Sequence, residues 1–114
     1  MTPLSTTIIL KALDCLSMRA EVAARNIANA GTPGYRPLRV TFENALIDAA
    51  SHGKSAVQAV EARIMRDTSA AANSGTRIDL ELATQSSTAM RYAALIEILN
   101  RRMQGEASAV SGNG

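Results

Sequence analysis

Residues 25–35 read Arg-Asn-Ile-Ala-Asn-Ala-Gly-Thr-Pro-Gly-Tyr, and this stretch marks where the first helix of the chain has to end. Gly31 is of the residue type that most often follows the last turn of a helix. Pro33 disfavours the helical conformation in the residue before it. Pro and Gly then fill the two central positions of a type II turn over residues 32–35. The sequence therefore predicts a helix that stops near Asn29 and a tight turn directly after it.

Before this turn, apolar residues recur at alternating steps of four and three. We expect one long helix within residues 1–30, with Ser5 as its N-terminal cap. The spacing is the heptad period of a coiled-coil seam, and its small alanines would let a partner helix approach closely. The members of this stripe are Ile9, Leu13, Leu16, Ala20, Ala23, Ile27 and Ala30.

The C-terminal third repeats this design over residues 78–105, where we predict a second long helix. Glu97 and Arg101 have the spacing of a favourable ion pair on one helix face. Gly105 is expected to end the helix, and residues 106–114 to form a flexible tail. Two matching stripes at opposite ends of the chain predict that the helices pack against each other. The second stripe consists of Leu82, Gln85, Ala89, Tyr92, Ile96, Leu99 and Met103.

The middle segment, residues 31–77, has weaker signals. Residues 38–50 predict a short extended stretch followed by about two turns of helix. Residues 57–65 fit a strand and a helix equally well, and residues 69–75 are typical of a flexible link. The expected fold class is mainly α, with two long N- and C-terminal helices packing as a coiled coil around a short, partly extended or flexible middle.

The composition limits what the chain can bury and bind. Aromatic residues make up only 3% of its 114 residues, so there are few large side chains for a core. We therefore expect much of the apolar surface to be buried against other chains. The net charge of +2 and the evenly spread cations argue against nucleic acid as a partner. Lys11 and Asp14 interrupt the first apolar stretch, so we expect neither membrane insertion nor a cleavable signal peptide.

No group of residues in the sequence predicts catalysis. Cys15 is the only cysteine, which rules out an internal disulfide or a thiolate cluster, and we expect it to be half-buried on a helix. His52 lies in a polar loop and is expected to be solvated. Asp79 and Glu81 fit a helix cap and a favourable interaction with the helix dipole. We expect no enzyme, no catalytic or metal site, no cofactor and no small-molecule substrate.

Three segments together resemble the flagellar basal-body rod proteins. Residues 25–35 are similar to the N-terminal signature of rod and hook proteins, in which Asn-Ile-Ala-Asn ends a helix and Thr-Pro-Gly-Tyr makes a turn. Residues 40–46, Val-Thr-Phe-Glu-Asn-Ala-Leu, resemble the segment that follows in the proximal-rod (FlgB) family. Residues 78–102 resemble the C-terminal helix of that family, including its Arg-Tyr pair. One departure is residues 73–76, Asn-Ser-Gly-Thr, where the family usually carries an Asp-Gly-Asn turn.

The resemblance implies a structural subunit of the proximal rod, the shaft that links the membrane ring to the distal rod and hook. Such proteins leave through the flagellar type III export apparatus without a cleaved signal and assemble helically in the periplasm. The implied partners are other rod subunits and the basal-body ring or its adaptor. The motif residues carried over are Asn26, Ile27, Ala28, Asn29, Thr32, Pro33, Gly34 and Tyr35.

Two questions stay open at the level of sequence. Asn26 and Asn29 either satisfy carbonyl groups in the last helical turn or bond a neighbouring subunit. Tyr92 is expected in the helix seam, with a hydroxyl that can also reach a neighbour. A coiled-coil adaptor unrelated to flagella is the alternative function. It explains both heptad stripes but gives no reason for residues 25–35.

Overall fold

The structure, a computed structural model, describes residues 2–69 and 76–110, with side chains as far as Glu106. The chain is mainly helical, and its long N- and C-terminal helices pack together, as predicted. A short two-stranded sheet lies in the middle segment. The elements are α1 (Leu4–Ala28), β1 (Leu38–Thr41), α2 (Glu43–Ala50), α3 (Lys54–Gln58), β2 (Arg63–Arg66) and α4 (Ile78–Val110).

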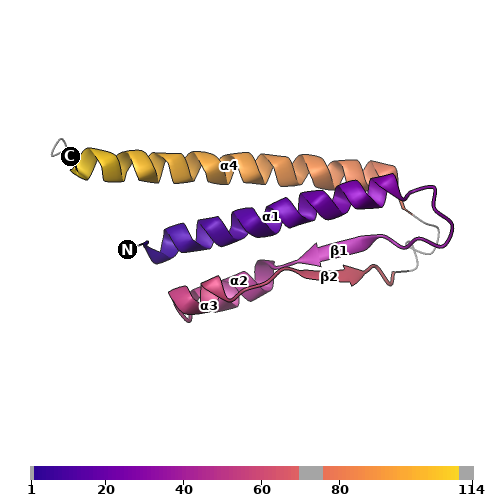
Figure 1. The fold of residues 1–114 in the computed structure, drawn as a ribbon, viewed down its shortest axis with the longest axis horizontal. Helices are drawn as coiled ribbons and strands as arrows, with labels where there is room; N and C mark the ends of the chain where they lie inside the picture. The colour runs from indigo at the N-terminus through magenta and orange to yellow at the C-terminus, as the bar shows by residue number, and fades with distance from the viewer. Residues whose placement is uncertain (1, 70–75, 111–114) are drawn as a thin grey trace.

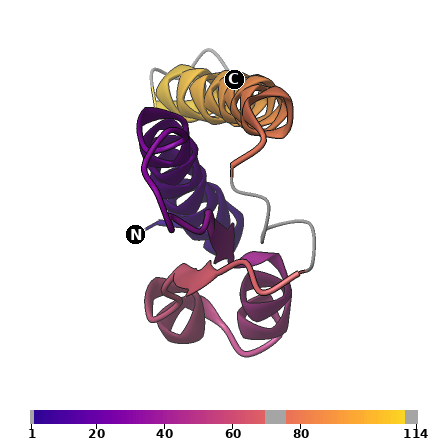
Figure 2. The same ribbon diagram turned by 90° about the vertical axis from the view of Figure 1, so that its right-hand side faces the viewer.

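The elements form three layers with α1 in the middle. Helix α4 covers one side of α1, and the sheet with α2 and α3 covers the other (Figures 1 and 2). The molecule measures 61 × 26 × 15 Å, with a radius of gyration of 17.6 Å. A compact domain of this length would have a radius of gyration of about 13 Å. The long helices therefore make this chain a rod rather than a sphere.

Helices α1 and α4 run antiparallel, so the start of α1 and the end of α4 lie at the same end of the rod (Figure 1). There, Arg102 Nη1 donates a hydrogen bond to Ser5 Oγ at 2.6 Å. The expectation that Ser5 caps the first helix is wrong, because α1 begins at Leu4 and no side chain caps it. The Ser5 hydroxyl is used instead to join the start of α1 to the far part of α4.

The middle segment combines both conformations that its sequence left open. Residues 38–50 form a strand and then a helix, as predicted. In the undecided stretch, Val57 belongs to α3 and Ile64 to β2. The strands pair antiparallel with Val40 opposite Ile64. Helices α2 and α3 connect the two strands; we call the strand pair the hairpin, and the strand pair with α2 and α3 the hairpin layer. The hairpin lies beside α1, and β1 is the nearer strand (Figure 1).

A small apolar core lies where α1 meets α2 and α3. Val57 is fully buried at its centre, and Cys15 is 3% exposed rather than half-buried. Burial raises the pKa of the Cys15 thiol, so the side chain acts as an apolar residue. The core consists of Cys15, Leu16, Phe42, Leu46, Ala49, Val57 and Val60.

The second long helix does not end where the sequence predicted. It continues through Gly105 to Val110, so the expected boundary between helix and tail is wrong. A single glycine costs a helix only about 1 kcal/mol relative to alanine, and the helix on both sides outweighs this cost. Residues 111–114 of the predicted tail and residues 70–75 of the predicted link lie outside the described residues.

Candidate functional site

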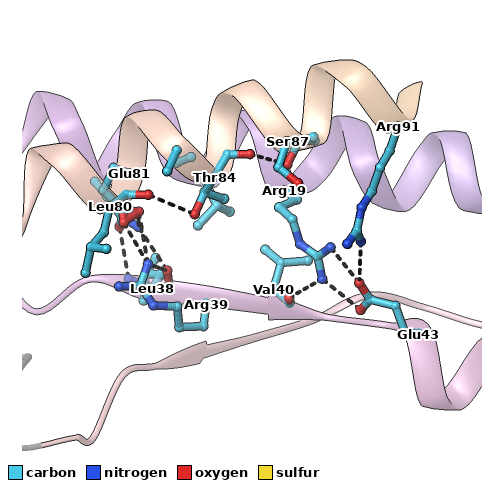
Figure 3. Close-up of a pocket in the computed structure, with 15 residues that line it drawn as sticks. Arg19, Leu38, Arg39, Val40, Glu43, Leu80, Glu81, Thr84, Ser87 and Arg91 are labelled. Carbon is cyan, nitrogen blue, oxygen red and sulfur yellow. Dashed lines mark hydrogen bonds and ion pairs between the residues drawn. The ribbon is translucent and has the colours of Figure 1, made fainter. Parts of the chain in front are cut away.

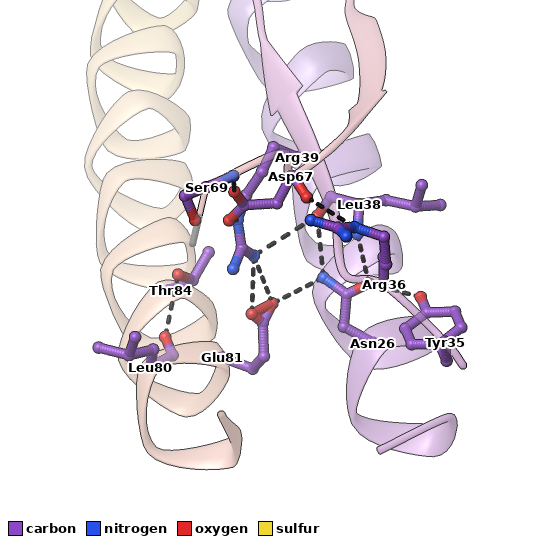
Figure 4. Close-up of polar contacts among 10 residues, drawn as sticks. All are labelled: Asn26, Tyr35, Arg36, Leu38, Arg39, Asp67, Ser69, Leu80, Glu81 and Thr84. Atoms are coloured by element: carbon purple, nitrogen blue, oxygen red, sulfur yellow. Dashed lines mark hydrogen bonds and ion pairs between the residues drawn. The ribbon is translucent and has the colours of Figure 1, made fainter. Parts of the chain in front are cut away.

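Asn26, the first asparagine of the motif, is 1% exposed and uses both ends of its amide within the chain. Its Nδ2 donates to Leu38 O at 2.9 Å and to Glu81 Oε1 at 2.7 Å. Its Oδ1 accepts from the Leu38 backbone N–H at 2.9 Å and from the Tyr35 hydroxyl at 2.6 Å (Figure 4). Asn26 does not bond the carbonyl groups of the last helical turn, which was the first role considered, and its buried amide is fully used within this chain. It joins α1 to the turn, to β1 and to α4.

The amide of Asn26 also closes the edge of strand β1 that faces away from β2. The Leu38 N–H and C=O point to α1 rather than to β2, and Asn26 satisfies both. The Val40 C=O points the same way and accepts from Arg19 Nη2 at 2.8 Å. Arg19 and Asn26 are seven residues apart, which places them two turns apart on one face of α1. The two side chains thus provide the hydrogen bonds that a third strand would provide.

Glu81 is the most unexpected residue of the structure. Its side chain is 1% exposed, although the sequence predicted only a helix cap and an interaction with the helix dipole. Glu81 does lie in the first turn of α4, but its partners were not predicted: Arg39 Nη1 binds both carboxylate oxygens, at 2.9 and 2.8 Å, beside the bond from Asn26 (Figure 4). A buried carboxylate requires such compensation, since desolvation alone costs several kcal/mol. Asp79, by contrast, stays exposed and pairs with Arg77 at 2.8 Å.

Asp67 extends this group of polar residues to the end of β2. Its Oδ2 accepts from Arg39 Nε at 3.1 Å, and its Oδ1 accepts from the Ser69 backbone N–H at 2.9 Å. Hydrogen bonds from Ser69, followed by Arg39, lower the pKa of Asp67 to about 2. Burial raises the pKa of the Tyr35 hydroxyl, which keeps it protonated as the donor to Asn26. We call Asn26, Tyr35, Arg39, Asp67 and Glu81 the Asn26 cluster.

The turn at residues 32–35 forms as predicted. The Tyr35 N–H donates to Thr32 O at 3.1 Å, and Gly34 has φ of +77°, which suits the third position of a type II turn. The turn thereby returns the Tyr35 hydroxyl to Asn26, nine residues earlier. Pro33 is exposed at the tip.

The end of α1 is closed by Asn29 rather than by the predicted glycine cap at Gly31. Asn29 Nδ2 donates to Arg25 O at 2.9 Å, which is one of the two roles considered for it. Its backbone O accepts from the Thr32 N–H at 3.0 Å. Gly31 has no positive φ, so this position does not require a glycine. Of the remaining motif residues, Ile27 is half-buried and Ala28 is exposed.

A second polar junction joins the same three layers farther along the rod. Arg19 binds both oxygens of Glu43, at 2.6 and 2.8 Å, and its guanidinium lies 4.8 Å from the centre of the Phe42 ring. Arg91 of α4 approaches the same carboxylate at 3.6 Å (Figure 3). The hydrogen bonds from Arg19 lower the pKa of Glu43 to about 2. Glu43 is therefore shared between α1 and α4.

A cleft of about 590 Å³ lies between these two junctions, with β1 on one side and α4 on the other (Figure 3). Its α4 wall carries hydroxyl groups, but two of them are already used within the helix. Thr84 Oγ1 donates to Leu80 O at 3.0 Å, and Thr88 Oγ1 donates to Thr84 O at 2.6 Å. The charged groups that line the cleft are paired with one another. The polar side chains that line the cleft therefore link the layers to one another, and none of them forms a pair of nucleophile and adjacent base.

The apolar stripe predicted for the first helix faces inward. Leu13 and Leu16 are 7% and 2% exposed, and Ile9 and Ala23 are also buried. Ala20 and Ile27 are half-buried. A neighbouring face of α1, which includes Val22 and Asn26, is buried as well, against the hairpin layer. The remaining face of α1 is exposed and carries mostly polar side chains, among them Asp14, Glu21 and Arg25.

The stripe predicted for the second helix does not lie centrally against α1. Ile96 and Leu99 are half-buried, but Leu82 and Met103 are 54% and 58% exposed, and Ala89 is exposed too. Assigning these three to the contact between the helices was wrong. The helix is rotated about its axis because Glu81 and Thr88 take the central positions that face α1. Glu81, Thr88 and Leu95 are seven residues apart, so this alternative stripe was present in the sequence.

The rotation leaves an apolar surface along one side of α4, which we call the α4 flank: Ile78, Leu82, Ala89, Ala93 and Met103. Beside it, a groove of about 330 Å³ runs between the two long helices and is lined by Leu16, Ala20, Gln85, Ala89 and Tyr92 among others. Tyr92 is 39% exposed there, at the rim of the contact rather than inside it.

The residues that sequence reasoning missed are the charged ones. Arg19, Arg39 and Glu43 all make two or more hydrogen bonds between elements, yet the arginines were considered only as evenly spread cations and Glu43 only as part of residues 40–46. For Arg19, one feature of the sequence could have indicated its role: it lies seven residues before Asn26, on the same face of the helix. His52 is exposed, and its Nδ1 lies 2.9 Å from Asp48 O.

Comparisons with other proteins add no assignment. No family model and no curated protein matches this chain. Within the described residues, no three His, Cys, Asp or Glu side chains are grouped closely enough to hold a metal ion. No described helix is long and apolar enough to cross a membrane.

Proposed function

We propose that this chain is a structural subunit of the proximal rod of the bacterial flagellar basal body. One observation carries the proposal furthest. The segments that resemble rod proteins lie far apart in the sequence, yet Asn26 and Tyr35 of the first segment meet Glu81 of the last in one buried cluster. The motif thus has a physical task, which is to fix how the two terminal helices and the turn are held together.

The α4 flank supports assembly with other copies. Its members Leu82, Ala89 and Met103 are separated by multiples of seven, so they lie on one side of the helix, which a helix of a neighbouring subunit can cover. In this proposal, α1 and α4 pack as a coiled coil within the subunit, and the same packing continues between subunits along the shaft. The elongated shape of the molecule, with its 61 Å long axis, suits a shaft built from parallel rods.

The proposal includes a location and a set of partners. The subunit leaves through the flagellar type III export apparatus without a cleaved signal peptide and assembles in the periplasm. It contacts other rod subunits and the basal-body ring or its adaptor, and it catalyses no reaction. A coiled-coil adaptor outside the flagellum would use the same exposed flank, but it would not account for the sequence of residues 25–35.

The direct test is to locate the protein. Basal bodies are purified from the native organism and probed with an antibody raised against this chain, alongside the cytosolic fraction. We expect the chain in basal bodies, and a deletion strain without rods, hooks or motility. Recovery in the cytosol alone, together with normal motility of the deletion strain, would contradict the proposal and favour the adaptor.

The role of the α4 flank has its own matched test. Ala89 and Ala94 are both exposed alanines of α4, but only Ala89 lies in the flank. Ala89→Asp places a charge in the expected contact between subunits, so we expect loss of rods and motility, whereas Ala94→Asp should behave as the parent. Circular dichroism should give the same helix content for both variants, which separates assembly from folding. Equal assembly of the two would exclude the flank as the interface.

A further inference from the structure

The outer edge of strand β2 presents backbone groups that no described residue satisfies. In an antiparallel pair, residues alternate between those that bond the partner strand and those whose N–H and C=O point away from it. Leu38 and Val40 point away from β2, because their backbone groups bond α1 side chains. Their partners in the register are Arg66 and Ile64. The N–H and C=O of Arg66 and Ile64 therefore point outward on the far side of β2.

The two edges of the sheet differ in how they are covered. The edge of β1 is closed by Asn26 and Arg19 of α1, whereas β2 lies on the outside of the hairpin layer (Figure 1). The hydrogen bonds made within residues 2–69 and 76–106 include none to the backbone of Ile64 or Arg66 outside the pairing with β1. All four residues of β2 are exposed, with Ile64 at 45% and Met65 at 52%. This edge has the geometry to receive a further strand.

The charge of the edge indicates which kind of strand fits. Arg63 and Arg66 both lie on β2, and neither is in an ion pair with a described residue. A hollow of about 370 Å³ continues from the end of the strand and is lined by Arg66, Arg36 and the turn at residues 32–35. Residues 63 and 66 lie on opposite faces of the strand, so an added strand with carboxylates on both faces would meet a cation on each.

A second copy of this chain is a poorer occupant. Pairing β2 with itself would bring Arg63 and Arg66 of both copies, four guanidinium groups in all, onto two adjacent strands. Asp67, the nearest acidic residue after the strand, is already bonded to Arg39 and Ser69. Like charges on neighbouring strands are destabilising. The edge therefore discriminates against itself and favours an acidic partner.

We propose that the outer edge of β2 binds an extended, acidic segment of another protein by strand addition. The Ile64 and Arg66 backbone groups supply the hydrogen bonds, and Arg63 and Arg66 select carboxylates. This inference rests on the hairpin alone and does not depend on a role in the rod. It also differs from the α4 flank, which is apolar and suited to a helix.

The test uses the full chain and a capped eight-residue peptide of valine with glutamates three residues apart, which places carboxylates on both faces of the added strand. Amide hydrogen exchange is followed by NMR, with and without the peptide. We expect protection to appear at Ile64 and Arg66, which alternate with the already protected Arg63 and Met65. Peptides with lysine in place of glutamate, or with N-methyl groups on alternate residues, should leave the exchange unchanged. The first retains the backbone donors, and the second retains the charge.

Two variants make the test specific. Ile64→Pro removes an outward N–H without removing a hydrogen bond to β1, so the hairpin should remain and peptide binding should fall at least about tenfold. Arg63→Glu combined with Arg66→Glu should weaken binding of the acidic peptide similarly and create binding of the lysine peptide. Unchanged exchange at Ile64 and Arg66 at millimolar peptide would overturn the proposal. Concentration-dependent dimers that protect these two amides would overturn the choice of partner.

Discussion

The two long helices have similar heptad patterns but very different surroundings. Helix α1 is the middle layer and is buried on two faces, one against α4 and one against the hairpin layer. Of the side chains described for α4, residues 78–106, only Glu81 and Thr88 are buried. Both are polar. The difference teaches that a heptad stripe predicts a helix contact but not which chain provides it.

The way each helix is held follows from this difference. Apolar burial holds α1, with residues such as Leu16 and Val22 below 5% exposed. Helix α4 is positioned by polar interactions. In its N-terminal part Glu81 is bonded to Asn26 and Arg39, and farther along Arg91 forms an ion pair with Glu43. Its apolar residues are mostly available to another molecule.

The largest expected effect compares one leucine from each helix. Leu16→Ala removes a side chain that is 2% exposed, and we expect the free energy of unfolding to fall by about 2–5 kcal/mol. Leu82→Ala removes one that is 54% exposed and should change it by less than about 0.5 kcal/mol. Urea denaturation of both variants measures this. Equal losses would mean that the two helices are buried alike and would break the comparison.

The next effect concerns the buried ion pair between Arg39 and Glu81, which holds the N-terminal part of α4. Arg39→Ala leaves the Glu81 carboxylate buried without its cation, so we expect a loss of about 3 kcal/mol in the free energy of unfolding. The exposed pair of Arg101 with Glu97 is the control, and Arg101→Ala should cost about 0.3–0.5 kcal/mol. Urea midpoints of the two variants decide the matter. A similar cost for both would show that Glu81 does not fasten α4.

A smaller effect tests the turn that joins α1 to the hairpin. Gly34 has φ of +77°, and an added Cβ would meet no atom within 4 Å. Gly34→Val should therefore cost only the backbone strain, about 1–2 kcal/mol, with Gly34→Ala below it. Gly31 is equally open but has no positive φ, so Gly31→Val should cost less than about 0.5 kcal/mol. Thermal melting of the three variants ranks them, and a reversed order would exclude the turn geometry.

The smallest effect is the response to acid. The pKa of Glu43 falls from 4.5 to about 2 in the fold, and that of Asp67 from 3.8 to about 2. Because the folded values are depressed, both groups stabilise the fold above their ordinary pKa, and this contribution is lost as the pH falls toward 2. Urea midpoints measured from pH 6 to pH 2.5 should fall less for Glu43→Gln than for the parent. Glu97→Gln, on the exposed surface, should keep the profile of the parent, and identical profiles for all three would contradict the assignment.

The parts of the fold that could be predicted are those that depend on local sequence. The period of the two helices, the turn at residues 32–35 and the strand before α2 all follow from neighbours within a few residues. The rotation of α4 could not be predicted in this way. It depends on whether a buried carboxylate at Glu81 finds a cation, and Arg39 lies 42 residues earlier.

The candidate site divides in the same way. That Asn26 matters was readable from its motif, but its four hydrogen bonds come from three separate elements. Of the two roles that the sequence offered for it, the bonds to the last helical turn are not made, and the buried amide is fully used within this chain. Asn29, whose partner is only four residues away, behaves as one of the local alternatives. Separation along the chain is therefore what limited prediction.

The hydrogen bond from Asn26 to Glu81 also has a consequence for timing, because it joins residues 55 positions apart. A ribosome adds roughly 5–20 residues per second, so Asn26 is made roughly 3–11 s before its partner. Throughout that interval, the end of α1 lacks the carboxylate that completes its buried cluster. The three layers can thus pack together only after the last third of the chain is made. Any protein that binds the segment around residue 81 would keep the buried cluster, and with it the packing of the layers, from forming.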